Sequence, residues 1–311
     1  MKTFILVLIA ILLVNACAKK PLNEGPTFFS NLRCTDIAPR RGLSVDFIGN
    51  APPTELTPGK RFPVSLKFAN YHREPIYADI TVQDDSGTQN VGTKKFEVTV
   101  EGATYENNRL VVPGCNINED LPEKNLGLFS YNLDANKDIR FVAKVKYEYA
   151  STISGSLCVF NPIVSSSTGC SASESLTGPT ALGPGTAYDP VTVTRMDKTL
   201  VGTDQNHVIV NLDVYIKNLV KSGVVSSPDQ ETVSFRIASE IPLNCRTRKE
   251  NDNKGTFFDV ILDEEGEARV NCESMLSLDR LEQGTFTIEL AYPYEYFIVS
   301  QPIRYRAEER R

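Results

Sequence analysis

The sequence predicts an all-β protein with two antiparallel β-sandwich domains in tandem after an export signal. Three observations support this prediction. The composition favours strands, with 15 Phe and 12 Tyr among 311 residues. Apolar and polar residues alternate with a period of two in most segments after residue 42, and no segment carries a helical apolar stripe. A stretch rich in Ser, Thr, Gly and Pro separates these segments into two groups.

The N-terminus has the three-part layout of an export signal. Lys2 is followed by an apolar run over residues 4–14 and by Ala16 before Cys17. The run is shorter than the roughly 20 residues that a membrane-spanning helix needs. Residues 14–17 resemble the lipobox of bacterial-type lipoproteins, which implies acylation of Cys17 and removal of residues 1–16, although Asn15 departs from that pattern. Simple secretion, an uncleaved membrane anchor and a buried N-terminal element are the alternatives.

The expected strands of the first domain each have one apolar face. The clearest is residues 139–149, where Phe141, Val145 and Tyr147 alternate with polar residues. The same alternation predicts strands at residues 43–48, 62–70, 76–83 and 96–100 in the first domain, and at 191–196, 207–218, 233–238, 257–262, 268–272, 285–299 and 302–307 in the second.

These segments divide the chain into six parts. They are a signal peptide (1–16), a membrane tether (17–41), a first β-sandwich domain (42–163), a Ser/Thr/Gly/Pro-rich linker (164–189), a second β-sandwich domain (190–307) and a charged tail (308–311). Motifs of the first half return in similar form in the second: 65–70 corresponds to 213–218, and 146–150 to 291–295. Such spacing indicates one module used twice.

The residues that carry this repeat also carry a resemblance. The Val210-x-Leu212-x-Val214 strand pattern and the late Tyr-x-Tyr strands resemble immunoglobulin-like and CARDB-like adhesion modules of exported bacterial and archaeal surface proteins. The resemblance covers most of residues 42–307. The N-x-G that usually follows the first strand in such modules is absent, since Leu219 follows Asn218. The resemblance implies an immunoglobulin-like fold and a role in adhesion.

The cysteines support an oxidising compartment. If Cys17 carries lipid, an even number remains: Cys34, Cys115, Cys158, Cys170, Cys245 and Cys272. We expect Cys245–Cys272 within the second domain, Cys158–Cys170 at the domain junction and, by elimination, Cys34–Cys115. A second-domain fragment, 189–311, is then expected to keep its own disulfide. A zinc site is disfavoured because the cysteines do not form close pairs.

Charge and composition exclude several classes of function. The net charge of −6 argues against a nucleic-acid partner and against electrostatic adhesion to anionic lipid. The two histidines, His72 and His207, fall in different predicted domains, and no nucleophile-elbow motif accompanies them. A hydrolase built on carboxylates would use Asp84 and Asp85, or Glu264 and Glu265, which lie in predicted turns. We therefore expect no enzyme and no catalytic residues.

Two sequence patterns are compatible with a bound ligand. Asp134, Asn136 and Asp138 occupy alternate positions as in calcium loops, but the turn glycine and the closing acid of such loops are absent, so an Asx-rich turn is the plainer interpretation. Residues 251–255 are a weaker match of the same kind. No other cofactor is expected. The tyrosines near 147 and 292–296 indicate the edge of a sandwich core, or else a stripe that binds sugar or peptide.

The sequence therefore predicts a non-catalytic, surface-anchored binding or structural protein. Its membrane contact would be the N-terminal lipid, and its partner a protein or an envelope polymer. The alternative is a solute-binding lipoprotein that captures a small ligand between its two domains. The strand–helix alternation typical of ligand-clamping domains is missing, which argues against that alternative.

Overall fold

The structure is a computed structural model. It describes residues 37, 40–49, 51–85, 93–106, 109–117, 128–164, 169–178, 182, 188–220, 223–225, 231–246, 257–277 and 282–307. The signal peptide, Cys17, most of the tether with Cys34, the 251–255 motif and the charged tail lie outside the described residues. Residues Cys34–Arg311 belong to one compact unit. Within it, the elements with defined bounds are all strands, in agreement with the predicted all-β fold.

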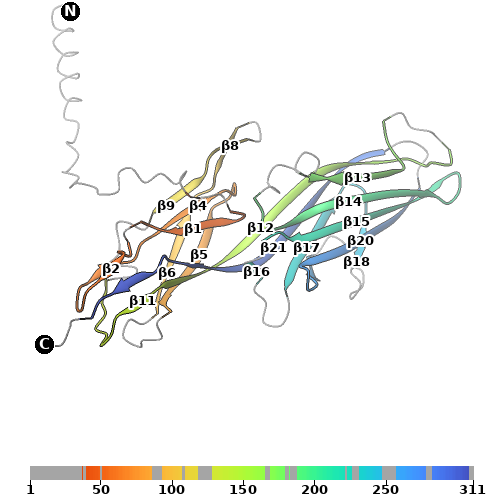
Figure 1. The fold of residues 1–311 in the computed structure, drawn as a ribbon. Helices are drawn as coiled ribbons and strands as arrows, with labels where there is room; N and C mark the ends of the chain where they lie inside the picture. Colours follow the sequence, from red (N-terminus) through yellow and green to blue (C-terminus); the bar gives the residue numbers. More distant parts are fainter. Residues whose placement is uncertain are drawn as a thin grey trace, which may run out of the picture. The chain divides into compact units, whose positions relative to one another are not determined.

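Two long strands organise this unit. β12 (Phe141–Val159) and β21 (Glu282–Val299) pair antiparallel over their full length, from Val142↔Val299 to Val159↔Glu282. Figure 1 shows the two strands side by side, with shorter strands on either side of them. They belong to a seven-stranded sheet, ordered β19-β17-β21-β12-β5-β6, in which β16 also pairs with β21. Its other strands are β5 (Ile76–Asp84), β6 (Lys94–Val100), β16 (Gly223–Val225), β17 (Thr232–Ser239) and β19 (Phe258–Ile261).

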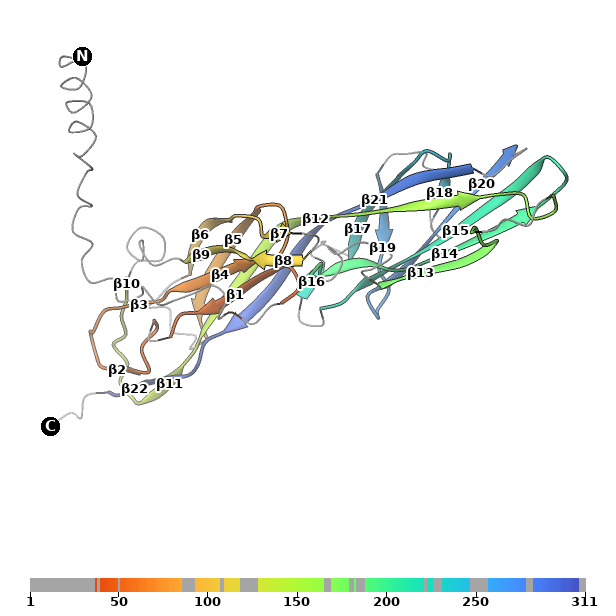
Figure 2. The same ribbon diagram turned by 90° about the horizontal axis from the view of Figure 1, so that it is seen from above.

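A five-stranded sheet packs against the C-terminal end of β12 and the N-terminal end of β21, and we call this region the second lobe. Its order is β13-β14-β15-β20-β18 (Figure 2). The backbone of Val191 bonds to the Tyr292 hydroxyl of β21, and Lys198 Nζ donates to the carbonyl of Cys158 in β12, which joins the two layers. The strands are β13 (Ser173–Thr177), β14 (Val191–Gly202), β15 (His207–Asn218), β18 (Asn244–Arg246) and β20 (Glu267–Ser277).

The opposite end of the long hairpin, together with β5 and β6, forms the first lobe. Smaller sheets pack there around Phe62, Phe129 and Phe141, whose ring centroids lie 5.0–6.1 Å apart. The sheets are β1-β4-β9, β10-β3, β7-β8 and β11-β22-β2, and their pairs are antiparallel except the parallel β2/β22. The bounds are β1 (Leu43–Phe47), β2 (Glu55–Leu56), β3 (Phe62–Pro63), β4 (Leu66–Asn70), β7 (Thr104–Glu106), β8 (Arg109–Val112), β9 (Gly114–Ile117), β10 (Leu128–Phe129), β11 (Lys137–Ile139) and β22 (Ile303–Tyr305).

The alternation of β12 explains how one strand serves both lobes. Its inward positions are buried from Phe141 to Val159 except at the half-buried Gly155, and Ser151 and Gly155 take two of them in the second half. Gly155 is small for a reason, because a Cβ there would overlap the ring of Phe286 on the paired strand. A small polar residue on the buried face hides the apolar pattern, so the sequence predicted only residues 139–149 as strand.

Strand pairing crosses the predicted domain boundary. β21 and β22 belong to the expected second domain, yet β21 pairs with β12, and β22 pairs with β2 and β11. One continuous cluster of buried side chains extends through both lobes, where two tandem domains would have separate cores. The expected linker also contributes structure, since β13 forms an edge of the five-stranded sheet. The two Tyr-x-Tyr motifs expected in separate repeats pair with each other, Tyr147↔Tyr294 and Tyr149↔Tyr292.

Candidate functional site

Five tyrosines fill the region where the two lobes meet. Each is at most 5% exposed, and the cross-strand rings lie 5.7 Å apart for Tyr147 and Tyr294 and 5.6 Å apart for Tyr149 and Tyr292. The fifth is Tyr296, whereas the neighbouring Phe297 points to solvent. Aromatic pairs at these separations add stability beyond the area they bury.

The hydroxyl groups of these tyrosines hold the starts of two strands. Tyr147 Oη accepts from the Leu43 amide at 3.2 Å, and Tyr296 Oη donates to the Leu43 carbonyl at 2.5 Å. Tyr292 Oη bonds both backbone groups of Val191, at 3.0 and 3.1 Å. The tyrosines are therefore a core with satisfied hydroxyls at these positions. A solute held between the lobes would need the space that their rings occupy.

A buried carboxylate lies beside this cluster. Asp189 is 2% exposed and accepts a hydrogen bond from Tyr149 Oη at 2.8 Å. Burial raises the pKa of Asp189 to about 7, although the Tyr149 hydrogen bond and the charge of Arg41 oppose the shift. The ring of His72 lies 4.9 Å from that of Tyr149, and burial lowers the pKa of His72. The Asp189 carboxylate can therefore take up a proton near neutral pH, and its hydrogen bond to Tyr149 stabilises the core.

The other residues considered for catalysis serve turns. Asp84 accepts from the Tyr131 hydroxyl at 2.9 Å, and Asp85 accepts from the Arg140 amide at 2.8 Å. Glu264 and Glu265 are exposed in the turn before β20, and His207 bonds Asp204 three residues before it. These contacts satisfy local backbone and side-chain groups, and none of them joins a histidine to a nucleophile.

A second candidate surface, rich in charged side chains, lies on the solvent side of β6, β5 and β12 in the first lobe. Strand register arranges its side chains in rows across the sheet. One row contains Lys95, Thr81 and Lys144, and the next contains Glu97, Asp79 and Lys146. We call the set the charged face, which comprises Tyr77, Asp79, Thr81, Lys95, Glu97, Lys144, Lys146 and Glu148.

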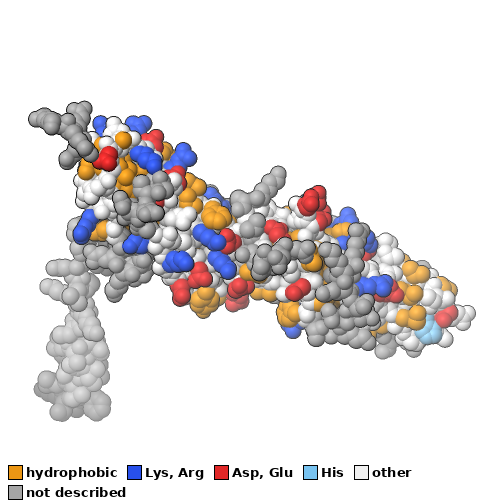
Figure 3. Space-filling model, turned by 90° about the horizontal axis from the view of Figure 1, so that it is seen from below, with side chains coloured by type: hydrophobic (Ala, Val, Ile, Leu, Met, Phe, Trp, Pro, Cys, Tyr) orange, Lys and Arg blue, Asp and Glu red, His pale blue; other side chains and the backbone are white. Residues whose placement is uncertain are grey.

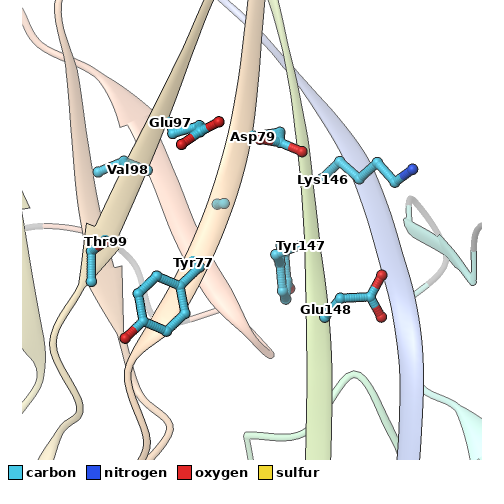
Figure 4. A pocket seen from close by; sticks show the side chains of 9 residues that line it. Tyr77, Asp79, Glu97, Val98, Thr99, Lys146, Tyr147 and Glu148 are labelled. Atoms are coloured by element: carbon cyan, nitrogen blue, oxygen red, sulfur yellow. The ribbon is translucent and has the colours of Figure 1, made fainter.

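Two adjoining hollows mark this face, of about 220 Å³ and 760 Å³. Both are lined by Asp79, Glu97 and Lys146, and the smaller one also by Tyr77 and Glu148. Figure 4 shows these side chains around the smaller hollow, with Lys146 extending away from Asp79. Tyr77 is 71% exposed, so its ring is open to a ligand. The face therefore offers an open recess with carboxylates, ammonium groups and one aromatic ring.

The acids of the charged face are not neutralised. Asp79 and Glu97 stand directly opposite each other on adjacent strands, an arrangement that costs stability. Among the described residues, neither forms an ion pair, and the same holds for Lys95 and Lys146. Lys144 is the exception, since its Nζ lies 2.7 Å from Glu295 Oε1. The like-charged pair is thus left to solvent or to a ligand.

The outer face of the five-stranded sheet also has two acids opposite each other, but there they are paired with arginines. Asp197 and Asp213 also stand directly opposite each other there. Arg269 makes two hydrogen bonds to Asp213, at 2.6 and 3.0 Å, and Arg195 Nε lies 3.1 Å from Asp197. Both guanidinium groups also lie over the Tyr215 ring, and we call these five residues the neutralised face. Burial works to raise the pKa of Asp213, but the hydrogen bonds of Arg269 and Asn271 lower it overall.

The remaining sequence-predicted sites have mixed outcomes. Cys158–Cys170 and Cys245–Cys272 are disulfides, the pairings expected from sequence. Cys115 is also disulfide-bonded, whereas Cys34, its expected partner, lies outside the described residues. Two disulfides are typical of a protein that folds in an oxidising, exported environment.

The calcium candidates lie on an exposed turn. Asp134, Asn136 and Asp138 are all exposed, and Asn136 Oδ1 accepts from the Ala307 amide at 2.8 Å. This bond ties the turn to the segment after β22. Across the described part of the chain, no three His, Cys, Asp or Glu side chains lie close enough together to hold a metal ion.

Comparisons with known proteins add little to this geometry. No protein-family model matches the chain, and no curated protein matches it. Among solved structures, it is similar to the C-terminal globular domain of an oligosaccharyltransferase from Pyrococcus abyssi, with 13% identity and a TM-score of 0.22. The match covers 86% of this chain and 50% of that chain, so this chain spans half the length of that structure. A similarity this weak assigns no function. In the described segments, no helix is both long and apolar enough to cross a membrane.

Sequence reasoning missed the charged face. Apart from Lys95, which lies just before a predicted strand, its residues occupy the outward positions of strands that the alternation did predict, at 76–83, 96–100 and 139–149. What the alternation lacks is register, which decides that Asp79 stands between Glu97 on β6 and Lys146 on β12. On the surface in Figure 3, basic and acidic side chains are likewise interspersed, so charge composition alone would not have singled out this face.

Proposed function

We propose that this protein is an exported, non-catalytic binding protein that contacts a protein or envelope polymer through the charged face. The observation that carries the proposal is the open recess whose carboxylates Asp79 and Glu97 face each other and form no ion pair with a described residue. An interaction surface gives such a pair a role, because partner charges offset its repulsion. Exposed Tyr77 beside the pair adds the kind of aromatic anchor that interfaces favour.

The proposal includes an anchor. The export signal, the small residue before Cys17 and the disulfides support a chain held at a membrane by lipid on Cys17. Acyl chains supply about 0.8 kcal/mol per buried CH₂, and a serine supplies none. Cys17→Ser should therefore move the protein from the membrane fraction to the soluble fraction. Full retention with membranes would instead indicate an uncleaved apolar helix.

Photo-cross-linking tests the binding role. A photoreactive phenylalanine analogue is placed at Tyr77 in the full-length chain and irradiated in intact cell envelopes. The matched control carries it at Met275, which is 65% exposed on the five-stranded sheet. A reproducible adduct at Tyr77 and none at Met275 is the expected result. Equal labelling at both positions, or none at either, would contradict a specific contact at the charged face.

A further inference from the structure

We infer that the partner of the charged face is an extended polypeptide segment with a basic and an acidic side chain two residues apart. This inference rests on the proposed function and specifies its ligand. It begins with the difference between the two outer faces. Asp197 and Asp213 are neutralised by arginines of the same chain, whereas neither Asp79 nor Glu97 forms an ion pair with a described residue, although Lys146 stands opposite Asp79. A ligand ammonium or guanidinium group would supply such a pair.

The row beside the acids has the opposite charge. Thr81, two residues from Asp79 on β5, stands between Lys95 and Lys144. Residues two apart on a strand are separated by about 6.6 Å along its axis. Over that distance the recess changes from a row with two acids and Lys146 to a row with two lysines and no acid. The two adjoining hollows together lie over both rows, so one continuous ligand can contact both rows.

An extended peptide has the same spacing. In such a segment, side chains at positions i and i+2 point to the same side and lie about 6.6 Å apart. A Lys-x-Glu sequence lying along β5 would place its ammonium over Asp79 and Glu97 and its carboxylate between Lys95 and Lys144. Charge complementarity thus favours a peptide over an uncharged glycan, which would supply no counter-charge to Asp79, Glu97 or Lys95.

Tyr77 adds a third contact point to the predicted ligand pattern. It lies two residues from Asp79 on the side away from Thr81, and its ring is open to solvent. A ligand residue two positions before the lysine would pack on that ring, so an apolar residue fits there. The inferred ligand pattern is therefore apolar-x-basic-x-acidic, in an extended conformation.

Fluorescence anisotropy with a labelled Leu-Ser-Lys-Ser-Glu-Ser peptide and the full-length protein tests the inference. The control peptide, Leu-Ser-Ser-Lys-Glu-Ser, has the same composition but places Lys and Glu on opposite sides. We expect Asp79→Asn/Glu97→Gln to weaken binding by about tenfold or more. The control variant Glu264→Gln/Glu265→Gln removes the same charge far along the chain from β5 and β6, and it should change the affinity less than about twofold. Cooperative thermal unfolding at a melting temperature no lower than that of the wild type verifies that both variants are folded.

A charge exchange sharpens the test. Asp79→Lys should restore affinity for a peptide with Glu in place of Lys. Equal binding of the test peptide and the control peptide would overturn the inference, as would no binding of the test peptide to the wild type at millimolar concentration. Tyr77-dependent binding of an uncharged oligosaccharide would assign the face to a glycan. Self-association that Asp79→Asn/Glu97→Gln abolishes would assign it to a second copy. In either case the Tyr77 cross-link would still form, so the proposed function would survive.

Discussion

The charged face and the neutralised face present the same electrostatic problem with different outcomes. Each has two carboxylates directly opposite on adjacent strands, Asp79 with Glu97 and Asp197 with Asp213. On the neutralised face, Arg195 and Arg269 bond the acids and lie over Tyr215. On the charged face, Tyr77 has no cation over its ring among the described residues. The comparison teaches that one face is completed within the chain, while the other is suited to a partner.

The largest expected effect is on the pH dependence of folding stability, and it comes from the buried acid Asp189. This contribution must be known before the pH dependence of the two surface pairs is compared. The folded pKa of Asp189, about 7, lies above the unfolded value of 3.8, so the folded state holds a proton that the unfolded state releases. Stability should therefore fall by roughly 4 kcal/mol as pH rises from about 4 to 7, and then level off.

Urea unfolding at pH 4 to 8 measures this fall. Asp189→Asn can still accept from Tyr149 and should flatten the profile, leaving the variant the more stable protein at pH 8. The depressed pKa of His72 acts in the opposite direction, since its stabilising effect is lost as pH falls below its unfolded value. An unchanged slope in the variant would assign the pH dependence to other groups.

The disulfides offer the next largest test. Cys245 and Cys272 face each other on β18 and β20, and β20 also carries Arg269 of the neutralised face. Cys245→Ala/Cys272→Ala should lower stability by up to about 3.5 kcal/mol, since the loop entropy of the unfolded chain rises. Cys158→Ala/Cys170→Ala, with a shorter loop, should cost up to about 3 kcal/mol. Thermal unfolding of both variants, each against the wild type, measures the difference. Free thiols in the oxidised protein would contradict the pairing.

Removing one arginine should make the neutralised face resemble the charged face. Arg269→Ala removes two hydrogen bonds to Asp213 and one cation over Tyr215, and should cost about 1–2 kcal/mol. Lys146→Ala is the matched change on the charged face, and should stay within about 0.5 kcal/mol. Denaturant midpoints give both values. Equal losses would mean that Lys146 already neutralises the acids of its row.

The smallest effect has opposite signs on the two faces. Asp79→Asn relieves repulsion from Glu97 and should raise stability by a few tenths of a kcal/mol. Asp213→Asn removes the acceptor of Arg269 and should lower stability by about 1 kcal/mol. Melting temperatures in low and high salt measure both changes, because salt screens the repulsion that the first variant removes. Stabilisation in both variants would erase the distinction between the faces.

Local alternation was sufficient to predict many strands. The expected strand at 207–218 coincides with β15, and β5 covers the strand expected at 76–83. The pattern failed where the buried face carries small or polar residues, as at Ser151 and Gly155 of β12. At these positions the paired strand supplies the bulk, such as Phe286 against Gly155, and one segment cannot reveal its partner.

Pairing between distant segments was the part that sequence could not supply. The expected boundary at 164–189 rested on a change of composition, whereas β12 and β21 join across it through tyrosine pairs. The candidate site had the same difficulty. Each outward residue of β5 and β6 is an ordinary polar residue by itself, and only the register makes Asp79 and Glu97 a pair.

The return of β22 to the first lobe has a consequence for biosynthesis. β22 completes a sheet with β2, and Arg306 bonds Glu55 across 251 residues of sequence. A growing chain that has released residues 42–163 lacks both β21 and β22, so its first lobe stays incomplete until these strands have left the ribosome. Such late pairing leaves the edge of β12 that β21 covers open to chaperones and to aggregation meanwhile. A fragment beginning at residue 189 would have the reverse defect, with β21 made but its partner β12 missing.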